Sequence, residues 1–241
     1  MSIPKIIHYC WFGPKPFSRT VKKCLKTWHK HLPDYEFCFW NEQTCATYAE
    51  EHHIPNPMEH PFVQSAYKAQ KYAFVADYVR FWALYHIGGI YLDTDVMVLK
   101  NFDNLLVEDK FFSGFEKIPS IKSIGACVMG TPMGCDVIQE VLDRYDTMQF
   151  EMSNQTNLVI PRVITPILQK YHNIMIYPYD YFYPMAFEER YTKHPEKYAT
   201  ENTYAIHLYD FSWIPWYSRI QRFIINYTKS LKLCLLQQKK D

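Results

Sequence analysis

The sequence predicts an α/β domain in which helices and strands alternate along the chain. The main indication is the stretch 71–87, whose apolar residues recur at three- and four-residue steps, the period of a helix packed against a core. Gly88 and Gly89 end this helix, and a short apolar run with strand propensity follows at once. Similar helix and strand patterns occur before and after it, and 241 residues suffice for one sizeable domain.

The composition is that of a globular protein in a reducing compartment. It is 48% hydrophobic and 21% charged with a formal net charge of +1, so charge does not suggest a nucleic-acid partner. The 7 cysteines are scattered and form no C-x-x-C pair, which argues against a disulfide framework or a structural zinc site. The chain begins close to its first predicted strand and has no apolar run of the ~18–20 residues that cross a bilayer, so we expect neither a signal peptide nor a spanning helix.

The N-terminal part of the chain predicts two strands, two helices and a loop. Ser18 is the expected N-cap of the first helix, whose outer face carries lysines. We expect His8 to have a structural role on the core side of the first strand, and Asn41 to cap a turn. The strands are expected at 6–12 and 35–40, the helices at 18–28 and 44–52, and an irregular loop at 54–62, which contains three prolines.

Beyond the helix–glycine–strand stretch of residues 71–102, helix and strand patterns continue to about residue 215. Strands are expected at 111–116, 124–130, 174–177 and 204–208, helices at 137–145 and 167–171, and an aromatic loop at 179–183. The tail, 216–241, has apolar residues at helical spacing and almost only positive charges. We therefore divide the chain into a domain of residues 1–215 and a basic amphipathic helix of residues 216–241. This helix either lies on an anionic membrane or packs on the domain.

Asp93-Thr94-Asp95 follows the central strand and is flanked by apolar residues. Two carboxylates one residue apart at the end of a buried strand repel each other and lose hydration. A divalent cation such as Mn²⁺ or Mg²⁺ would remove this cost, since these ions prefer oxygen ligands. The alternative is an acidic turn that faces solvent. The apolar flanks and the preceding glycine pair favour the metal site.

Asp77 and Arg80 lie three residues apart on one face of the helix that leads to this acidic pair. The plain interpretation is an intrahelical ion pair worth ~0.2–0.5 kcal/mol. Both residues nevertheless lie on a mostly apolar helix that leads directly to the acidic pair.

Three segments resemble one enzyme family, and they occur in the family's order. They are I-P-K-I-I-H-Y-C-W-F-G at 3–13, A-x-x-A-D-x-x-R at 73–80 and G-G-I-Y-L-D-T-D at 88–95. They resemble the D-x-D glycosyltransferases that include yeast-type initiating mannosyltransferases and bacterial capsular-polysaccharide transferases, and they are also similar to the glucosyltransferase domains of large clostridial toxins. The resemblance implies a GT-A-like nucleotide-sugar-binding fold with a central mixed, mostly parallel sheet flanked by helices.

The resemblance also implies roles for individual residues. Trp11 would stack on the nucleotide base, although a core position beside a turn is about equally compatible with the local sequence. Asp77 and Arg80 would hold hydroxyls of the donor sugar, with Arg80 also near the diphosphate. His207 would complete the metal site of Asp93 and Asp95, although a lone strand histidine is more often structural and the toxin-like relatives carry a carboxylate near this point. The other predicted donor contacts are Tyr91, Thr94, Ser212 and Trp213.

The function implied is a metal-dependent glycosyltransferase that moves a hexose from a nucleoside-diphosphate sugar to an acceptor hydroxyl with retention of configuration. A UDP-hexose is the favoured donor and GDP-mannose the other. The expected acceptor is a glycan or glycolipid, such as a capsular or lipopolysaccharide intermediate, and the expected location is the cytoplasm, at the membrane face. The alternatives are a non-catalytic nucleotide-sugar-binding partner of another transferase and a metal-dependent phosphohydrolase.

Overall fold

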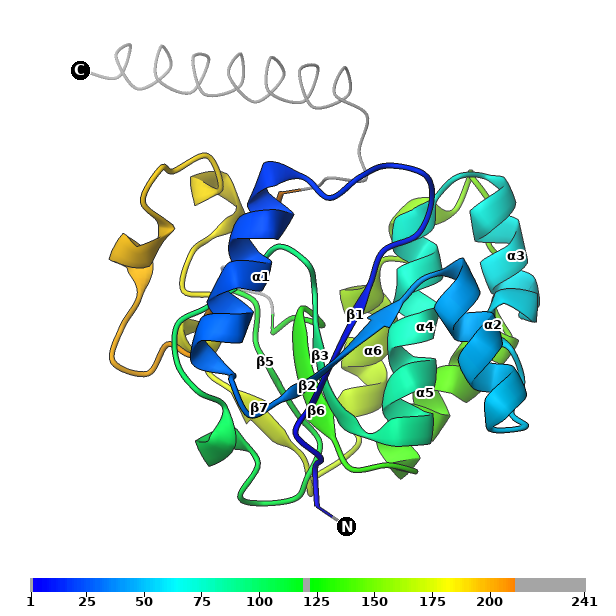
Figure 1. The fold of residues 1–241 in the computed structure, drawn as a ribbon, viewed down its shortest axis with the longest axis horizontal. Coiled ribbons are helices and arrows are strands. Elements are labelled where there is room, and N and C mark those ends of the chain that lie inside the picture. The colour runs from blue at the N-terminus through cyan, green and yellow to red at the C-terminus, as the bar shows by residue number, and fades with distance from the viewer. Residues whose placement is uncertain (1, 119–121, 211–241) are drawn as a thin grey trace, which may run out of the picture. The chain divides into compact units, whose positions relative to one another are not determined.

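The computed structural model describes residues 2–118 and 122–210 (Figure 1). The predicted contacts Ser212 and Trp213, the domain end at residue 215 and the expected helix at 216–241 lie outside these residues.

The predicted mixed, mostly parallel sheet is present. Its six strands have the order β2-β1-β3-β6-β5-β7, and only β6 runs antiparallel to its neighbours. A second sheet pairs β4 with β8 in antiparallel register. The strands are β1 Ile6–Cys10, β2 Glu36–Trp40, β3 Gly89–Leu92, β4 Val96–Val98, β5 Phe112–Gly114, β6 Val128–Thr131, β7 Met175–Tyr177 and β8 Ala205–His207.

Helices cover both faces of the large sheet. Helix α1 and the small sheet lie on one face, and α2 to α6 lie on the other (Figure 1). The helices are α1 Arg19–His31, α2 Glu42–Glu51, α3 Pro61–Lys68, α4 Tyr72–Ile87, α5 Asp136–Asp146 and α6 Ile160–Leu168. Short 3₁₀ turns lie at Pro57–Glu59, Asp103–Leu105, Gln155–Asn157, Tyr179–Tyr181, Phe187–Glu189 and Pro195–Tyr198.

Helix α1 begins as predicted and holds the small sheet in place. The Ser18 hydroxyl accepts a hydrogen bond from the backbone N–H of Val21 at 3.1 Å, which caps the helix. On its inner face, the Trp28 indole N–H donates to the carbonyl of Val96 at 2.7 Å. The Thr27 hydroxyl accepts from the backbone N–H of Val98 at 3.0 Å. These side chains therefore fix β4, the strand that follows the acidic pair.

Helix α4 and strand β3 form the predicted helix–glycine–strand unit. The helix ends at Gly88, whose φ of 73° favours glycine. His8, on the neighbouring strand β1, has the structural role that the sequence predicts. It is fully buried, accepts a hydrogen bond from the Trp40 indole at 3.1 Å and contacts the Gly88 carbonyl through Nε2 at 2.7 Å. Burial lowers the pKa of His8 to about 4, so the ring is neutral near pH 7.

The prolines explain two boundaries that the sequence analysis placed wrongly. The predicted loop 54–62 contains Pro61, which is the first residue of α3, and α6 begins at Ile160, just before Pro161. Proline is favoured in the first helical turn, because its missing N–H would have no partner there. The prolines therefore mark helix starts at these two positions rather than an irregular chain.

The strand predicted at 124–130 is β6, which begins only at Val128. The preceding residues use their backbone groups elsewhere. The N–H of Ile124 donates to the Thr165 hydroxyl at 3.0 Å, and the N–H of Cys127 donates to the Tyr183 hydroxyl at 2.9 Å. These long-range contacts replace the regular strand ladder, and sequence periodicity does not reveal them.

None of the helices within the described residues is both long and apolar enough to cross a bilayer. The six cysteines in this part of the chain are free thiols.

We expect Gly88→Ala to destabilise the fold strongly. A Cβ at this position would lie 2.6 Å from the backbone nitrogen of Met133 and 3.0 Å from the Pro132 carbonyl carbon, in the turn between β6 and α5. Gly134→Ala is the matched control, since Gly134 has a similar φ of 67° but no atom within 4 Å of the added Cβ. The control should lose about 1–2 kcal/mol of unfolding free energy and Gly88→Ala at least about twice that. Equal losses in urea denaturation would contradict the close approach.

Candidate active site

The acidic pair lies at the edge of the sheet where β1, β2 and β3 end. Asp93 directly follows β3, and its backbone N–H donates to the carbonyl of Cys127 at 2.9 Å. The N–H of Val96 donates to the carbonyl of Asp93 at 3.0 Å and closes a tight turn around Thr94 and Asp95. In open α/β sheets this edge, outside the carboxyl ends of parallel strands, is where ligands bind.

Arg80 is buried beneath this turn and binds two of the predicted carboxylates. Its side chain is 5% exposed, and one guanidinium nitrogen lies 2.9 Å from Asp77 Oδ1 and 3.1 Å from Asp93 Oδ1. A second nitrogen donates to the carbonyl of Ala126 at 2.9 Å, and the guanidinium lies 4.3 Å from the centre of the Tyr91 ring. A buried cation requires partners of this kind. The predicted pair of Asp77 and Arg80 is thus part of a larger cluster that includes Asp93.

Burial has a strong effect on the carboxyl group of Asp77. Burial raises its pKa to about 7; the charge of Arg80 opposes the rise and that of Asp93 adds to it. For Arg80, burial alone would lower the pKa, but the charges of Asp93, Tyr91 and Asp77 raise it well above its ordinary value. The guanidinium therefore stays charged, and the carboxyl group of Asp77 takes up a proton near pH 7.

Asp95 faces the other side of the turn and binds the chain around β8. Nε2 of His207 lies 3.4 Å from Asp95 Oδ1, and the backbone N–H of Asp210 donates to Asp95 Oδ2 at 2.8 Å. Burial opposes ionisation of Asp95, but the charge of His207 and these hydrogen bonds hold its pKa below the usual range. Burial would lower the pKa of His207, and the charge of Asp95 raises it instead. The two half-buried groups thus stabilise each other's charged forms.

Asp93, Asp95 and His207 fit a divalent cation. One ligand atom from each residue lies within 4.8 Å of the other two. Nδ1 of His207 is buried and has no hydrogen-bond partner among the described residues. Tyr91 and Arg80 both contact Oδ1 of Asp93, so the second oxygen of this carboxylate can bind an ion. Two carboxylates and an imidazole suit Mn²⁺ or Mg²⁺ completed by substrate oxygens.

The remaining predicted donor contacts occupy different positions. Trp11 is half-buried just beyond β1, where its indole N–H donates to the carbonyl of Lys15 at 2.6 Å. Thr94 is half-buried between the two aspartates. Tyr91 is only 1% exposed, and its hydroxyl donates to Asp93 Oδ1 at 3.1 Å. Tyr91 therefore contacts Asp93 through its hydroxyl and Arg80 through its ring, within the buried part of the site. Stacking of Trp11 on the nucleotide base stays a prediction.

The sequence analysis gave Ser18 and Tyr209 no role in the site, although both fix the geometry around β8. The Ser18 hydroxyl, besides capping α1, donates to Asp210 Oδ2 at 3.0 Å. Tyr209 has a φ of 53°, and its ring centre lies 4.1 Å from that of His207. A non-glycine residue in this conformation is uncommon and often marks a functional turn. The signal available in the sequence was Asp210, a carboxylate three residues after the predicted metal ligand His207.

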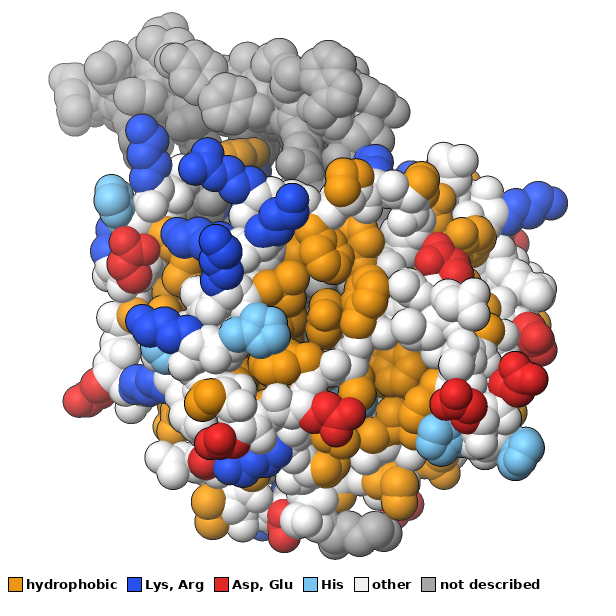
Figure 2. Space-filling view, in the orientation of Figure 1, with side chains coloured by type: hydrophobic (Ala, Val, Ile, Leu, Met, Phe, Trp, Pro, Cys, Tyr) orange, Lys and Arg blue, Asp and Glu red, His pale blue; other side chains and the backbone are white. Residues whose placement is uncertain are grey.

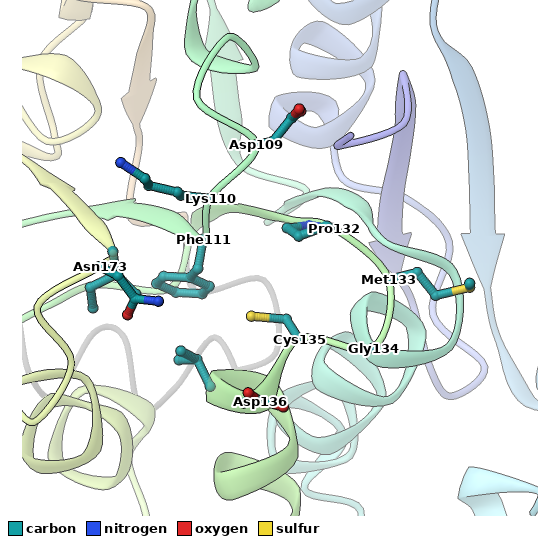
Figure 3. A pocket seen from close by; sticks show the side chains of 11 residues that line it. Asp109, Lys110, Phe111, Pro132, Met133, Gly134, Cys135, Asp136 and Asn173 are labelled. Atoms are coloured by element: carbon teal, nitrogen blue, oxygen red, sulfur yellow. The ribbon is translucent and has the colours of Figure 1, made fainter. Parts of the chain in front are cut away.

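A hollow of about 240 Å³ lies at the opposite edge of the sheet (Figure 3). Asp109, Phe111, Pro132, Cys135 and Asn173 are among its lining residues. Pro132 follows the end of β6 that pairs with the start of β3, whereas Asp93 follows the end of β3. This hollow is therefore separate from the acidic cluster.

Part of the chain that contains this site is similar to a known family. Residues 18–112 match the family described as a glycosyltransferase sugar-binding region containing a DXD motif. The chain is 30% identical over 127 residues to inositol phosphoceramide mannosyltransferase 1 of Schizosaccharomyces pombe. These 127 residues cover 51% of this chain and 36% of that protein. It is 24% identical to an uncharacterized glycosyltransferase of Acanthamoeba polyphaga mimivirus, over 88% of this chain and 84% of that protein. The chain spans about a third of the length of the fungal relatives it matches.

Solved structures share the fold. PaToxG glycosyltransferase matches with a TM-score of 0.52 at 21% identity over 70% of each chain. The glycosyltransferase GlyE of Streptococcus pneumoniae matches with a TM-score of 0.50 at 10% identity over 87% of this chain and 55% of that one. The fold is therefore that of the GT-A glycosyltransferases, and the resemblance based on the three sequence segments is confirmed.

We expect Asp77→Asn to reduce the pH dependence of stability in the metal-free protein. The Asp77 carboxyl has a pKa of about 7 when folded and ~3.9 when unfolded, so between these values the folded state holds a proton that the unfolded state has lost. The unfolding free energy should therefore fall as pH rises from about 4 to 7, by on the order of 4 kcal/mol at most from this group.

Urea denaturation across this pH range measures the effect as the difference between wild type and variant. Asp143→Asn is the control, since Asp143 is an exposed carboxylate on α5 that accepts a hydrogen bond from Gln139. It should keep the wild-type pH dependence. If Asp77→Asn also keeps it, the carboxyl of Asp77 is already ionised at pH 4.

Proposed function

We propose that this chain, which carries a D-x-D glycosyltransferase domain, transfers a hexose from a nucleoside-diphosphate sugar to the hydroxyl of a glycan or glycolipid. The observation that carries the proposal is the cluster of Asp93, Asp95 and His207, whose ligand atoms lie within 4.8 Å of one another. Glycosyltransferases of the D-x-D type use a divalent cation and a nucleotide-sugar donor. A site built from these three groups suits that chemistry.

In the proposed reaction the bond between the anomeric carbon and the diphosphate oxygen breaks, and the acceptor oxygen forms the new bond to that carbon. The diphosphate leaves with the electron pair of the broken bond, and its leaving oxygen takes up the proton that the acceptor hydroxyl loses. A divalent cation held by Asp93, Asp95 and His207 would supply positive charge for this diphosphate. Retention of configuration is the stereochemical course that we propose from the family resemblance.

The protein residues contribute orientation and fixed charge. Arg80 holds Asp93 in place through its 3.1 Å contact, and its guanidinium provides a permanent positive charge beneath the D-x-D turn. Such preorganised charge stabilises a leaving anion without further rearrangement. His207 and the N–H of Asp210 hold Asp95 from the other side. The two carboxylates are thus oriented before any ligand binds.

The donor and acceptor are proposed by class. A UDP-hexose is favoured by the predicted stacking of Trp11, and GDP-mannose is supported by the fungal relatives, whose names describe mannosyl transfer. Those names also describe a lipid acceptor, inositol phosphoceramide. A lipid-borne surface-glycan intermediate, reached from the cytoplasmic face of a membrane, is the acceptor that we propose. Turnover of a panel of UDP-hexoses and GDP-mannose distinguishes the donors.

We expect Asp93→Asn and Asp95→Asn each to lower donor turnover on the order of a hundredfold or more, because the charge that binds the cation is lost. Both variants should fold. In Asp93→Asn, the Arg80 guanidinium still has Asp77 as its carboxylate partner, and in Asp95→Asn both carboxylate partners of Arg80 remain. The measurements are circular dichroism, and turnover with Mn²⁺ and with EDTA. Asp143→Asn, which removes an exposed carboxylate on α5, should leave turnover unchanged.

Three outcomes would change the proposal. Wild-type turnover that persists in EDTA excludes the metal role. Tight donor binding without transfer to any acceptor indicates a non-catalytic nucleotide-sugar-binding protein. Donor hydrolysis that no acceptor stimulates or redirects indicates a phosphohydrolase.

A further inference from the structure

Helix α1 carries an unusual charge distribution. Its thirteen residues include Arg19, Lys22, Lys23, Lys26 and Lys30, and no aspartate or glutamate. The inner residues Val21, Cys24 and Trp28 are buried, and all five cationic side chains are exposed. Figure 2 shows Lys and Arg side chains gathered on the surface over this helix.

These cations form one stripe. Arg19, Lys23, Lys26 and Lys30 follow one another at steps of four, three and four residues, so they lie on one face of the helix. At 1.5 Å per residue the stripe is about 17 Å long. None of the five cations forms a salt bridge with a described residue. The charge of Lys23 contributes to lowering the pKa of Glu196, without a salt bridge between the two. Within residues 2–118 and 122–210, the charge on the basic face of α1 therefore has no ion-pair partner.

Aromatic side chains border the basic face along the edge strand β2. Phe37 and Phe39 are two residues apart, which places them on one side of the sheet, and both are half-buried. The Phe37 ring lies 4.5 Å from that of His29 on α1, and the Phe39 ring lies 5.8 Å from that of Phe17. We call Phe17, Phe37 and Phe39 the aromatic flank. Figure 2 shows hydrophobic side chains beside the cations on this surface.

The basic face is connected directly to the candidate active site. Ser18, the N-cap of α1, donates a hydrogen bond to Asp210, whose backbone N–H in turn donates to Asp95. Trp28 and Thr27 fix β4, which follows the D-x-D turn. Whatever binds the basic face is therefore held at a set distance and direction from Asp93 and Asp95.

We propose that the basic face of α1 and its aromatic flank dock on a membrane that contains anionic lipids. This inference rests on the proposed function, since docking would bring the site to an acceptor carried by a lipid. Clustered lysines are attracted to anionic headgroups, and aromatic rings suit the interface between headgroups and acyl chains. The formal net charge of only +1 and the apolar border fit a membrane better than a nucleic acid. The described chain ends at Asp210, and residues 216–241 add further lysines and arginines in sequence.

The test is co-sedimentation of the full chain with vesicles of phosphatidylcholine alone or phosphatidylcholine with phosphatidylglycerol, at low and high salt. The triple variant Lys23→Gln, Lys26→Gln, Lys30→Gln removes three charges from the stripe, and glutamine keeps a similar helix propensity. The matched control Lys68→Gln, Arg144→Gln, Arg162→Gln removes three exposed charges from α3, α5 and α6. Wild type and control should bind the anionic vesicles alike, with little binding to phosphatidylcholine alone.

The stripe variant should bind on the order of 100-fold more weakly, since each basic residue near an anionic surface contributes roughly fivefold. The proposal is overturned if the wild-type protein does not co-sediment with anionic vesicles. It is also overturned if the stripe variant binds them as strongly as the control does. Lysine-dependent binding to duplex DNA without binding to vesicles also overturns it and assigns the surface to nucleic acid.

Turnover with a soluble acceptor is measured on the same three proteins. Because the stripe lies outside the acidic cluster, all three should turn over donor equally. Vesicle binding without turnover would leave docking intact and contradict the proposed transferase activity, so the two proposals fail separately.

Discussion

The buried guanidinium of Arg80 is the contact on which the site depends. It joins Asp77 on its own helix, Asp93 at the end of β3 and the carbonyl of Ala126 before β6. Removing a cation from water is costly unless several partners replace the water, and here two carboxylates, a carbonyl and the face of Tyr91 do so. Because these partners come from three segments, the cation fixes the helix, the D-x-D turn and the start of β6 relative to one another.

The D-x-D turn is held by contacts on two sides. Asp93 is bound from the side of α4, through Arg80 and Tyr91. Asp95 is bound from the side of β8 and α1 by His207 and by the backbone N–H of Asp210. Ser18 in turn holds the side chain of Asp210. Two carboxylates that would repel each other in isolation therefore each have a side-chain partner, the Arg80 guanidinium for Asp93 and the His207 imidazole for Asp95. This arrangement keeps the fold from depending on the ligand that the site is proposed to hold.

Much of the fold could be read from the sequence because its signals are local. The helical spacing of apolar residues in α4, the N-cap Ser18 and the strand expected at 35–40 each depend on neighbours within a few positions. The structure confirms the helix, the cap and the strand. The failures share a different cause. Pro61 was read as part of a loop although proline also starts helices, and α6 begins at Ile160 rather than at the predicted residue 167. Strand β6 was predicted too long because the backbone N–H groups of Ile124 and Cys127 bond to side chains far along the chain.

By itself, the sequence indicated the resemblance to D-x-D glycosyltransferases and predicted the α/β fold class. It also singled out Asp77, Arg80, Asp93 and Asp95, because these residues lie in short motifs whose spacing has chemical meaning. Tertiary structure alone decided how they are used. His207 is 112 positions beyond Asp95 in the numbering of the chain and meets it only because β8 pairs with β4, with Val96 opposite His207. Asp210 and Ser18 are brought together in the same way. The pKa of Asp77 likewise depends on burial beside Arg80 and Asp93, since desolvation arises from packing, which sequence spacing does not contain.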